Sequence, residues 1–175
     1  MKIKKKTGIV FWITGLSGSG KSTIGEKLKT LLKKKFGKTL IIHGDDIRDI
    51  YNYKSYSKYQ RLKLGKANSN FCKLIADQKI NVIFTTVGLF NELFKYNKKN
   101  LQQYVEIYIE SDIEKLIKNK RKIFYKKKKN NVWGLDLKPE FPKNPDITIK
   151  NNFKISSENL AKSLYKKILD LKKFR

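Results

Sequence analysis

Cysteine is nearly absent from this chain of 175 residues, and long apolar runs are absent altogether. The single cysteine, Cys72, excludes a disulfide within the chain. It falls in a helical pattern of apolar residues, so we expect a buried small side chain and not a reactive thiol. No stretch is apolar enough for long enough to span a bilayer, which argues against a membrane partner. The lysine-rich start, residues 1–6, leads into the first apolar run without the core of a signal peptide, so we expect a cytoplasmic protein.

Acidic residues are also scarce, with 15 Asp and Glu against 41 Lys and Arg and a formal net charge of +26. Such a charge ordinarily suggests nucleic acid or an acidic membrane surface as partner. Only four of the basic residues are arginines, and the lysines are spread over every predicted helix among many Asn, Ile and Tyr residues. We therefore interpret the charge as a compositional bias and expect no specific nucleic-acid partner. The one dense block, Lys126–Lys129, is either a solvated loop or part of a lid that contacts phosphates.

One motif stands out, because residues 15–23 read Gly-Leu-Ser-Gly-Ser-Gly-Lys-Ser-Thr. The apolar run Ile9–Ile13 before it predicts a buried strand, and Lys21–Phe36 after it predicts a helix. A strand, a glycine-rich loop and a helix in this order are typical of a P-loop, which binds the phosphates of a nucleoside triphosphate; the competing interpretation is a chance Gly/Ser turn. The predicted phosphate-binding residues are Gly15, Leu16, Ser17, Gly18, Ser19, Gly20, Lys21, Ser22 and Thr23. Among them, Lys21 is expected to reach the β- and γ-phosphates and Ser22 to ligate Mg²⁺.

Strand and helix patterns alternate along the chain, which predicts a parallel sheet with helices on both faces. The length fits a single domain over residues 1–175. We predict an α/β, P-loop NTPase-type three-layer fold with about five strands. The predicted strands are Ile9–Thr14, Thr39–His43, Asn81–Thr86, Tyr104–Glu110 and Ile147–Lys150. Beyond the helix after the loop, the predicted helices are Tyr56–Lys79, Phe90–Gln103, Asp112–Lys120 and a last one capped by Ser156, with Leu160, Leu164, Ile168 and Leu171 on its core-facing stripe.

Ligands of open parallel sheets bind beyond the carboxyl ends of the strands, so the residues that follow each strand matter most. The second strand is followed by Gly-Asp-Asp-Ile-Arg, residues 44–48. Asp45 or Asp46 is suited to hold Mg²⁺ or to accept a proton from a hydroxyl, and Arg48 to bind an anionic substrate. The competing interpretation is a helix cap followed by a surface arginine. Arg61 is either a second anion-binding residue or a solvated helical side chain.

The only histidine, His43, closes the second predicted strand. A structural imidazole is the default expectation, and a role beside the metal or the γ-phosphate is the alternative. The third predicted strand ends in Thr-Thr-Val-Gly without an acidic residue, which leaves Asp45 and Asp46 as the leading acids at the site.

These motifs together resemble those of the adenylyl-sulfate kinases, P-loop enzymes that phosphorylate the 3′-hydroxyl of adenosine 5′-phosphosulfate. The resemblance covers nearly the whole chain. It rests on the loop, on residues 44–48, on Tyr56-Ser57 followed by Arg61, and on the stretches 104–109, 133–136 and 142–147.

The resemblance implies that Lys21 and Asp45 are the catalytic residues, with Asp45 the base or metal-linked acid beside the acceptor hydroxyl. It implies that Arg48 and Arg61 bind the anionic groups of the nucleotide acceptor and that Tyr56 stacks on its base. ATP is then the donor, Mg²⁺ the cofactor with Ser22 and Asp45 as its ligands, and a small nucleotide the acceptor. A homodimer is one possible assembly of the chain.

The departures from the family pattern cluster on the acceptor side. His43 stands where the family has an aspartate, Leu64-Gly65-Lys66-Ala67 where it has Asn-Ile-Arg-Arg, and Gly88-Leu89-Phe90-Asn91 where it has Ser-Pro-(Tyr/Phe)-Arg. The lid, residues 119–125, is altered as well.

Three functions follow for testing. The first is phosphorylation of adenosine 5′-phosphosulfate in sulfate activation, and the second is phosphorylation of another nucleotide 3′-hydroxyl, such as that of a cytidine diphosphate derivative in surface-polysaccharide modification. The third is a catalytically weak nucleotide-binding or RNA-associated protein.

Overall fold

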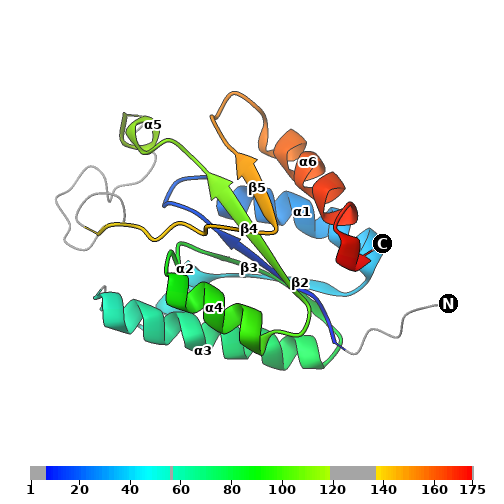
Figure 1. Cartoon of the computed structure of the whole chain (residues 1–175), viewed down its shortest axis with the longest axis horizontal. Helices are drawn as coiled ribbons and strands as arrows, with labels where there is room; N and C mark the ends of the chain where they lie inside the picture. The colour runs from blue at the N-terminus through cyan, green and yellow to red at the C-terminus, as the bar shows by residue number, and fades with distance from the viewer. Residues whose placement is uncertain (1–6, 56, 119–136, 175) are drawn as a thin grey trace.

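A sheet of five parallel strands forms the centre of the computed structural model, which describes residues 7–55, 57–118 and 137–174 (Figure 1). The spatial order is β2-β3-β1-β4-β5, and every neighbouring pair is parallel. The predicted parallel sheet and its strand count are confirmed. The strands are β1 (Val10–Thr14), β2 (Thr39–His43), β3 (Asn81–Thr86), β4 (Tyr104–Glu110) and β5 (Ile147–Lys150).

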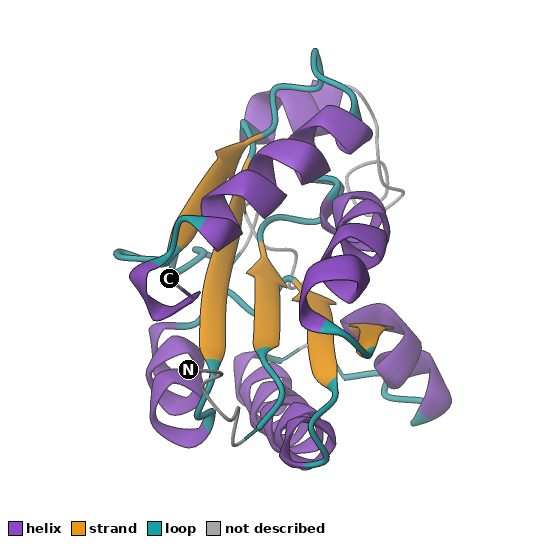
Figure 2. Cartoon of the chain, turned by 90° about the vertical axis from the view of Figure 1, so that its right-hand side faces the viewer, coloured by secondary structure: helices purple, strands orange, loops and turns teal. Residues whose placement is uncertain are grey.

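Helices cover both faces of this sheet, as Figure 2 shows from the side. The helices are α1 (Lys21–Phe36), α2 (Gly44–Ile50), α3 (Lys58–Asp77), α4 (Asn91–Asn100), α5 (Ile113–Lys118) and α6 (Ser157–Leu169), followed by the 3₁₀ turn η2 (Lys172–Phe174). Helices α1 and α6 pack on one face, against a core that includes Phe11, Ile83 and Ile107. Helices α3 and α4 pack on the other face, where Trp12 stacks on Phe84 with ring centroids 4.5 Å apart. This is the predicted three-layer arrangement.

The strand bounds match the prediction except at one strand end, and the helices α3, α4 and α5 are each shorter than predicted by one to three residues at an end. Strand β1 begins at Val10 and not at Ile9, because the Ile9 N–H donates to the side-chain Oδ1 of buried Asn81 at 3.0 Å. The predicted cap of the last helix is also present, since the Ser156 hydroxyl accepts a hydrogen bond from the Asn159 N–H. The expected burial of Cys72 is confirmed, and burial raises the pKa of its thiol.

Helix α2 is absent from the predicted helices, although one interpretation of residues 44–48 placed a helix cap there. It contains seven residues and begins directly after β2, with His43 at the N-cap and no side-chain cap. The interpretation in which an aspartate caps this segment is therefore wrong, because Asp45 and Asp46 lie inside the first turn. A helix this short carries too few apolar positions for a 3.6-residue period to emerge.

The sheet places the loop after β1 at its centre. Strand β1 lies between β3 and β4, so the carboxyl ends of three strands surround residues 15–20. No described helix is long and apolar enough to cross a membrane.

Candidate active site

The loop between β1 and α1 turns tightly and ends on the first residue of the helix. The Ser19 N–H donates to the Leu16 carbonyl at 3.2 Å, and Gly20 is the N-cap of α1, so the loop closes within five residues. Backbone N–H groups at such a helix start form a site for anionic phosphate. Leu16 itself is 2% exposed and packs in the core, so its side chain lies away from this site.

Two of the loop glycines are required by the structure. A Cβ at Gly15 would lie 2.5 Å from the Ile109 carbonyl oxygen of β4, which no side chain tolerates. Gly20 has φ of +90°, a left-handed conformation that favours glycine, and a Cβ there would lie 2.9 Å from the Asn151 side chain. The loop is therefore packed against both β4 and the segment after β5.

Lys21 occupies the first position of α1 and is only 8% exposed. Its ammonium donates to the Leu16 carbonyl at 2.7 Å and lies 3.4 Å from the Ser19 hydroxyl. The charge is thus held over the loop that precedes it. A buried ammonium at a helix start is suited to stabilise negative charge on a phosphate.

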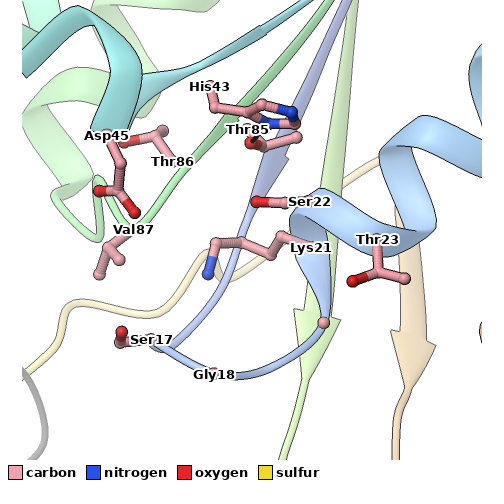
Figure 3. A pocket seen from close by; sticks show the side chains of 11 residues that line it. Ser17, Gly18, Lys21, Ser22, Thr23, His43, Asp45, Thr85, Thr86 and Val87 are labelled. Atoms are coloured by element: carbon pink, nitrogen blue, oxygen red, sulfur yellow. Dashed lines mark hydrogen bonds between the residues drawn. The ribbon is translucent and has the colours of Figure 1, made fainter. Parts of the chain in front are cut away.

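A pocket of about 380 Å³ opens in front of this loop (Figure 3). Lys21 Nζ, the Ser22 hydroxyl and the Asp45 carboxylate point into the same space. The lining residues are Ser17, Gly18, Gly20, Lys21, Ser22, Thr23, His43, Asp45, Thr85, Thr86 and Val87. The pocket therefore joins the predicted loop to the predicted acid at the carboxyl ends of β2 and β3, and Asp46 is not among its lining residues.

His43 lines the same pocket and links three elements. Its Nε2 lies 3.1 Å from the Glu26 carboxylate on α1, and its Nδ1 lies 2.7 Å from the Thr85 hydroxyl at the end of β3. A carboxylate only accepts hydrogen bonds, so Nε2 carries a proton, and in the neutral ring Nδ1 accepts from Thr85. His43 is thus a hydrogen-bonded, structural imidazole, which agrees with the default expectation, and it also borders the pocket.

The side chains at this pocket suit a hard cation in the presence of phosphates. Among the described residues, no cluster of three or more His, Cys, Asp or Glu side chains is arranged to hold a metal. Ser22 and Asp45 do offer a hydroxyl and a carboxylate oxygen to one space. Mg²⁺ prefers such oxygen ligands, binds through one or two protein side chains and completes its shell with water and substrate phosphates. The donor set therefore fits Mg²⁺.

A second, smaller pocket of about 250 Å³ continues from the first around the start of α1. Gly20 and Thr23 line both pockets, which makes them neighbours. The remaining lining residues are Ile24, Asn151, Phe153, Ile155, Ser157 and Leu160. An aromatic and aliphatic lining with a few polar groups is typical of a site for a flat organic ring.

A family model for adenylylsulphate kinase matches residues 7–150. The chain belongs to the adenylylsulphate kinase family. It is therefore a kinase, a phosphotransferase with a hydroxyl acceptor.

Individual relatives divide between two acceptors. The chain is 36% identical to a cytidine diphosphoramidate kinase of Campylobacter jejuni, over 94% of this chain and 98% of the relative. It is 32% identical to an adenylyl-sulfate kinase of Clostridium kluyveri, over 86% of this chain and 79% of the relative. In fold it is similar to the Mycobacterium tuberculosis APS kinase CysC solved with AMPPNP and APS. That similarity has a TM-score of 0.84 at 23% identity and covers 93% of this chain and 98% of the other.

Two of the predicted acceptor-binding residues, Arg48 and Arg61, are not among the residues that line the two pockets. Arg48 Nη1 donates to the carbonyls of Tyr53 and Ser55 at 2.9 and 2.8 Å, and its guanidinium lies 5.4 Å from the centre of the Tyr53 ring. These contacts fix the segment after α2. Arg61 is half-buried on the first turn of α3. Their predicted roles in acceptor binding stay predictions.

Several expectations fall outside the described residues. They are the stacking role of Tyr56, the lid at 119–125, the lysine block 126–129 and the motif at 133–136.

Several of the positions where the chain departs from the family pattern contribute to packing between α3 and α4. A Cβ on Gly65 of α3 would lie 2.8 Å from Leu93 Cδ2 of α4, so the two helices are in close contact. Lys66 pairs with Glu92 across the same helix pair. Leu89 and Phe90 are buried, at 0% and 2% exposure. Leu64 and Ala67 thus replace the asparagine and the second arginine of the family pattern, while Lys66 keeps a positive charge at the first arginine position and pairs with Glu92.

Sequence reasoning missed three kinds of residue at the site. Thr85, Thr86 and Val87 line the pocket, and their position at the end of a strand beside β1 was the available signal. Glu26 contacts His43 from α1, which no local pattern reveals. Asn151 contacts the loop from 132 positions away in the sequence.

Proposed function

We propose that this chain transfers the γ-phosphoryl group of ATP to the ribose 3′-hydroxyl of a cytidine diphosphate derivative of the phosphoramidate type. The observation that carries the choice of acceptor is the replacement of two polar family residues on α3. Leu64 and Ala67 stand where the family pattern has an asparagine and an arginine, so an amide and a guanidinium expected to bind the acceptor of adenylyl-sulfate kinases are absent there. A site that has lost such groups loses its discrimination for the substrate that they bound. The relative named for cytidine diphosphoramidate, matched over nearly its whole length, supports the same choice.

The donor side supports ATP as phosphoryl donor. The triphosphate fits the pocket in front of the loop, where Lys21 and the loop N–H groups face negative charge. The base fits the adjoining pocket beside Phe153 and Ile155. Because Gly20 and Thr23 border both pockets, one nucleotide can occupy them together.

The reaction follows from the residues at the meeting point of loop and strands. Asp45 orients the acceptor hydroxyl and accepts its proton, while Lys21 stabilises the charge that develops on the transferred phosphoryl group. Ser22 and Asp45 would hold Mg²⁺, which when bound neutralises charge on the β- and γ-phosphates. Attack and departure are in line, so the acceptor enters from the side of Asp45, opposite the β-phosphate.

Adenosine 5′-phosphosulfate is the second candidate acceptor. The family match and the residues 44–48 favour it, since they carry the part of the pattern associated with that substrate. In that case the chain acts in sulfate activation.

The deciding experiment measures kcat/KM for a cytidine diphosphoramidate, for cytidine diphosphate and for adenosine 5′-phosphosulfate with saturating Mg·ATP. We expect the cytidine diphosphoramidate to be favoured over the adenosine compound by at least ~10-fold, about 1.4 kcal/mol of transition-state binding. A preference for adenosine 5′-phosphosulfate would reverse the assignment. Binding of ATP without transfer to any of the three would support the third function, a nucleotide-binding protein without turnover.

A further inference from the structure

We propose that Asn151 is a positioning residue that couples the base pocket to the phosphate loop. The proposal rests on the proposed function in one respect, because it takes ATP as the ligand of the two adjoining pockets. It adds a residue that neither the loop motif nor the acceptor motifs include.

The side chain of Asn151 bridges two segments that are far apart in the sequence. It lies directly after β5, where its own N–H donates to the Glu110 carbonyl at 2.8 Å. Its Nδ2 donates to the Ser19 carbonyl at 2.9 Å, and its Oδ1 accepts from the Phe153 N–H at 3.0 Å. The second contact fixes the orientation of the amide, because only the oxygen can accept from an N–H. Asn151 is 7% exposed, so these contacts form away from water.

The contact with Ser19 determines the direction of a loop amide. The peptide between Ser19 and Gly20 is trans and planar, so its C=O and N–H point in opposite directions. Holding the Ser19 carbonyl on Asn151 therefore turns the Gly20 N–H away from Asn151. That N–H is at the helix start, where the loop donors face a phosphate. The left-handed φ of +90° at Gly20 is part of the same turn.

The contact with Phe153 acts on the other pocket. Phe153 has φ of +65°, a conformation that few non-glycine residues adopt, and the Oδ1 of Asn151 holds its N–H in place. Phe153 and Asn151 both line the base pocket, together with Gly20. A base that packs against Phe153 therefore stabilises the same amide that holds the loop. Base binding and phosphate binding should strengthen each other.

The neighbouring Asn152 supplies a matched control. It has the same side chain and is exposed, and its Oδ1 accepts from the Lys154 N–H at 3.0 Å. Asn152→Ala therefore removes a local turn contact without touching the loop. Asn151→Ala removes both bridging contacts. Asn151→Asp keeps the acceptor for Phe153 and cannot donate to Ser19.

The test is calorimetric binding of two probes, ATP and inorganic tripolyphosphate, to the wild type and the three variants. Tripolyphosphate has the phosphates and lacks the adenosine, so the ratio of the two affinities reports the contribution of the base and its ribose. Two lost hydrogen bonds predict that Asn151→Ala binds ATP roughly 10-fold to 30-fold more weakly than the wild type. Tripolyphosphate should lose less, so the ratio falls. Asn151→Asp should weaken both probes together, and Asn152→Ala should match the wild type.

A purely structural role for Asn151 makes a different prediction. It would lower the affinities for ATP and tripolyphosphate by the same factor in Asn151→Ala, and that result would overturn the proposal. Equal affinities of the wild type for the two probes, or wild-type affinities in Asn151→Ala, would overturn it as well. Thermal unfolding identifies a variant that fails to fold. If Asn151→Ala does not fold, Asn151→Asp tests the contact with Ser19 alone, and wild-type affinities for both probes in that variant would overturn the proposal. No acceptor is present in this measurement, so its failure is distinct from failure of the acceptor assay.

Discussion

Replacing Asp45 with Asn tests the catalytic carboxylate, and the adjacent Asp46 provides a control of the same type. Both residues lie in the first turn of α2 and both are exposed, but only Asp45 lines the pocket (Figure 3). Either substitution removes one negative charge from the start of this helix. That change alone is worth about 0.3–1 kcal/mol, or no more than ~5-fold in any equilibrium.

The two variants should nevertheless differ widely in turnover. Loss of a positioned general base costs ~10²-fold to 10⁴-fold, which is about 2.7–5.4 kcal/mol in the barrier. We therefore expect kcat at saturating Mg·ATP and acceptor to fall by at least ~10²-fold in Asp45→Asn and to stay within ~5-fold of wild type in Asp46→Asn. Titration with Mg²⁺ separates the two functions of Asp45, because excess metal restores activity only where metal binding was weakened. A larger loss in Asp46→Asn would refute the assignment.

Three further predictions concern packing, the buried thiol and pH. Gly65→Ala should destabilise the fold, since overpacking against Leu93 costs about 1–3 kcal/mol and the higher helix propensity of alanine gains only about 1 kcal/mol. In a Leu93→Ala background the same change should stabilise the fold, and an equal effect of Gly65→Ala in both backgrounds, measured by denaturant unfolding, would contradict the contact. Cys72 should resist a thiol reagent at pH 8 in the native state and react on unfolding, because burial raises the pKa of its thiol. Labelling of the native protein as fast as that of the denatured chain would contradict this prediction. The hydrogen bond from Lys58 lowers the pKa of Glu140, so this carboxylate stabilises the fold above the ordinary glutamate pKa, and the stabilisation is lost as pH falls through the lowered value. The melting temperatures of wild type and Glu140→Gln should therefore converge as pH falls toward 3, and a difference between them that widens would contradict the prediction.

Much of the fold could be predicted because the strands correspond to short, largely apolar runs in the sequence. The buried sequence Val10–Thr14 and its neighbours β3 and β4 leave few alternatives to a central parallel sheet. The loop motif was predictable for a related reason, since glycine, lysine and serine occur at spacings that phosphate binding requires. The position of Asp45 at the pocket followed from the rule that ligands bind at the carboxyl ends of strands.

The remaining features depend on contacts between distant elements. The periodicity of apolar residues within a helix does not predict that Gly65 contacts Leu93, because this contact depends on how α3 packs against α4. The pairing of His43 with Glu26 likewise requires α1 to lie beside the end of β2. The spacing and the family resemblance predict Arg48 as a ligand for an anion. Its contacts with the backbone carbonyls of Tyr53 and Ser55 depend on the turn of the chain after α2, which neither of these signals describes.

The most direct test of the central proposal follows the phosphoryl group itself. The wild type and Lys21→Ala are each incubated with Mg²⁺, ATP labelled at the γ-phosphate and the cytidine diphosphoramidate acceptor, and the products are separated. We predict label in the acceptor nucleotide with the wild type and a loss of at least ~10²-fold with Lys21→Ala, whose circular dichroism spectrum should match the wild type. Undiminished transfer by Lys21→Ala, or label released by the wild type only as inorganic phosphate, would contradict phosphoryl transfer at this loop.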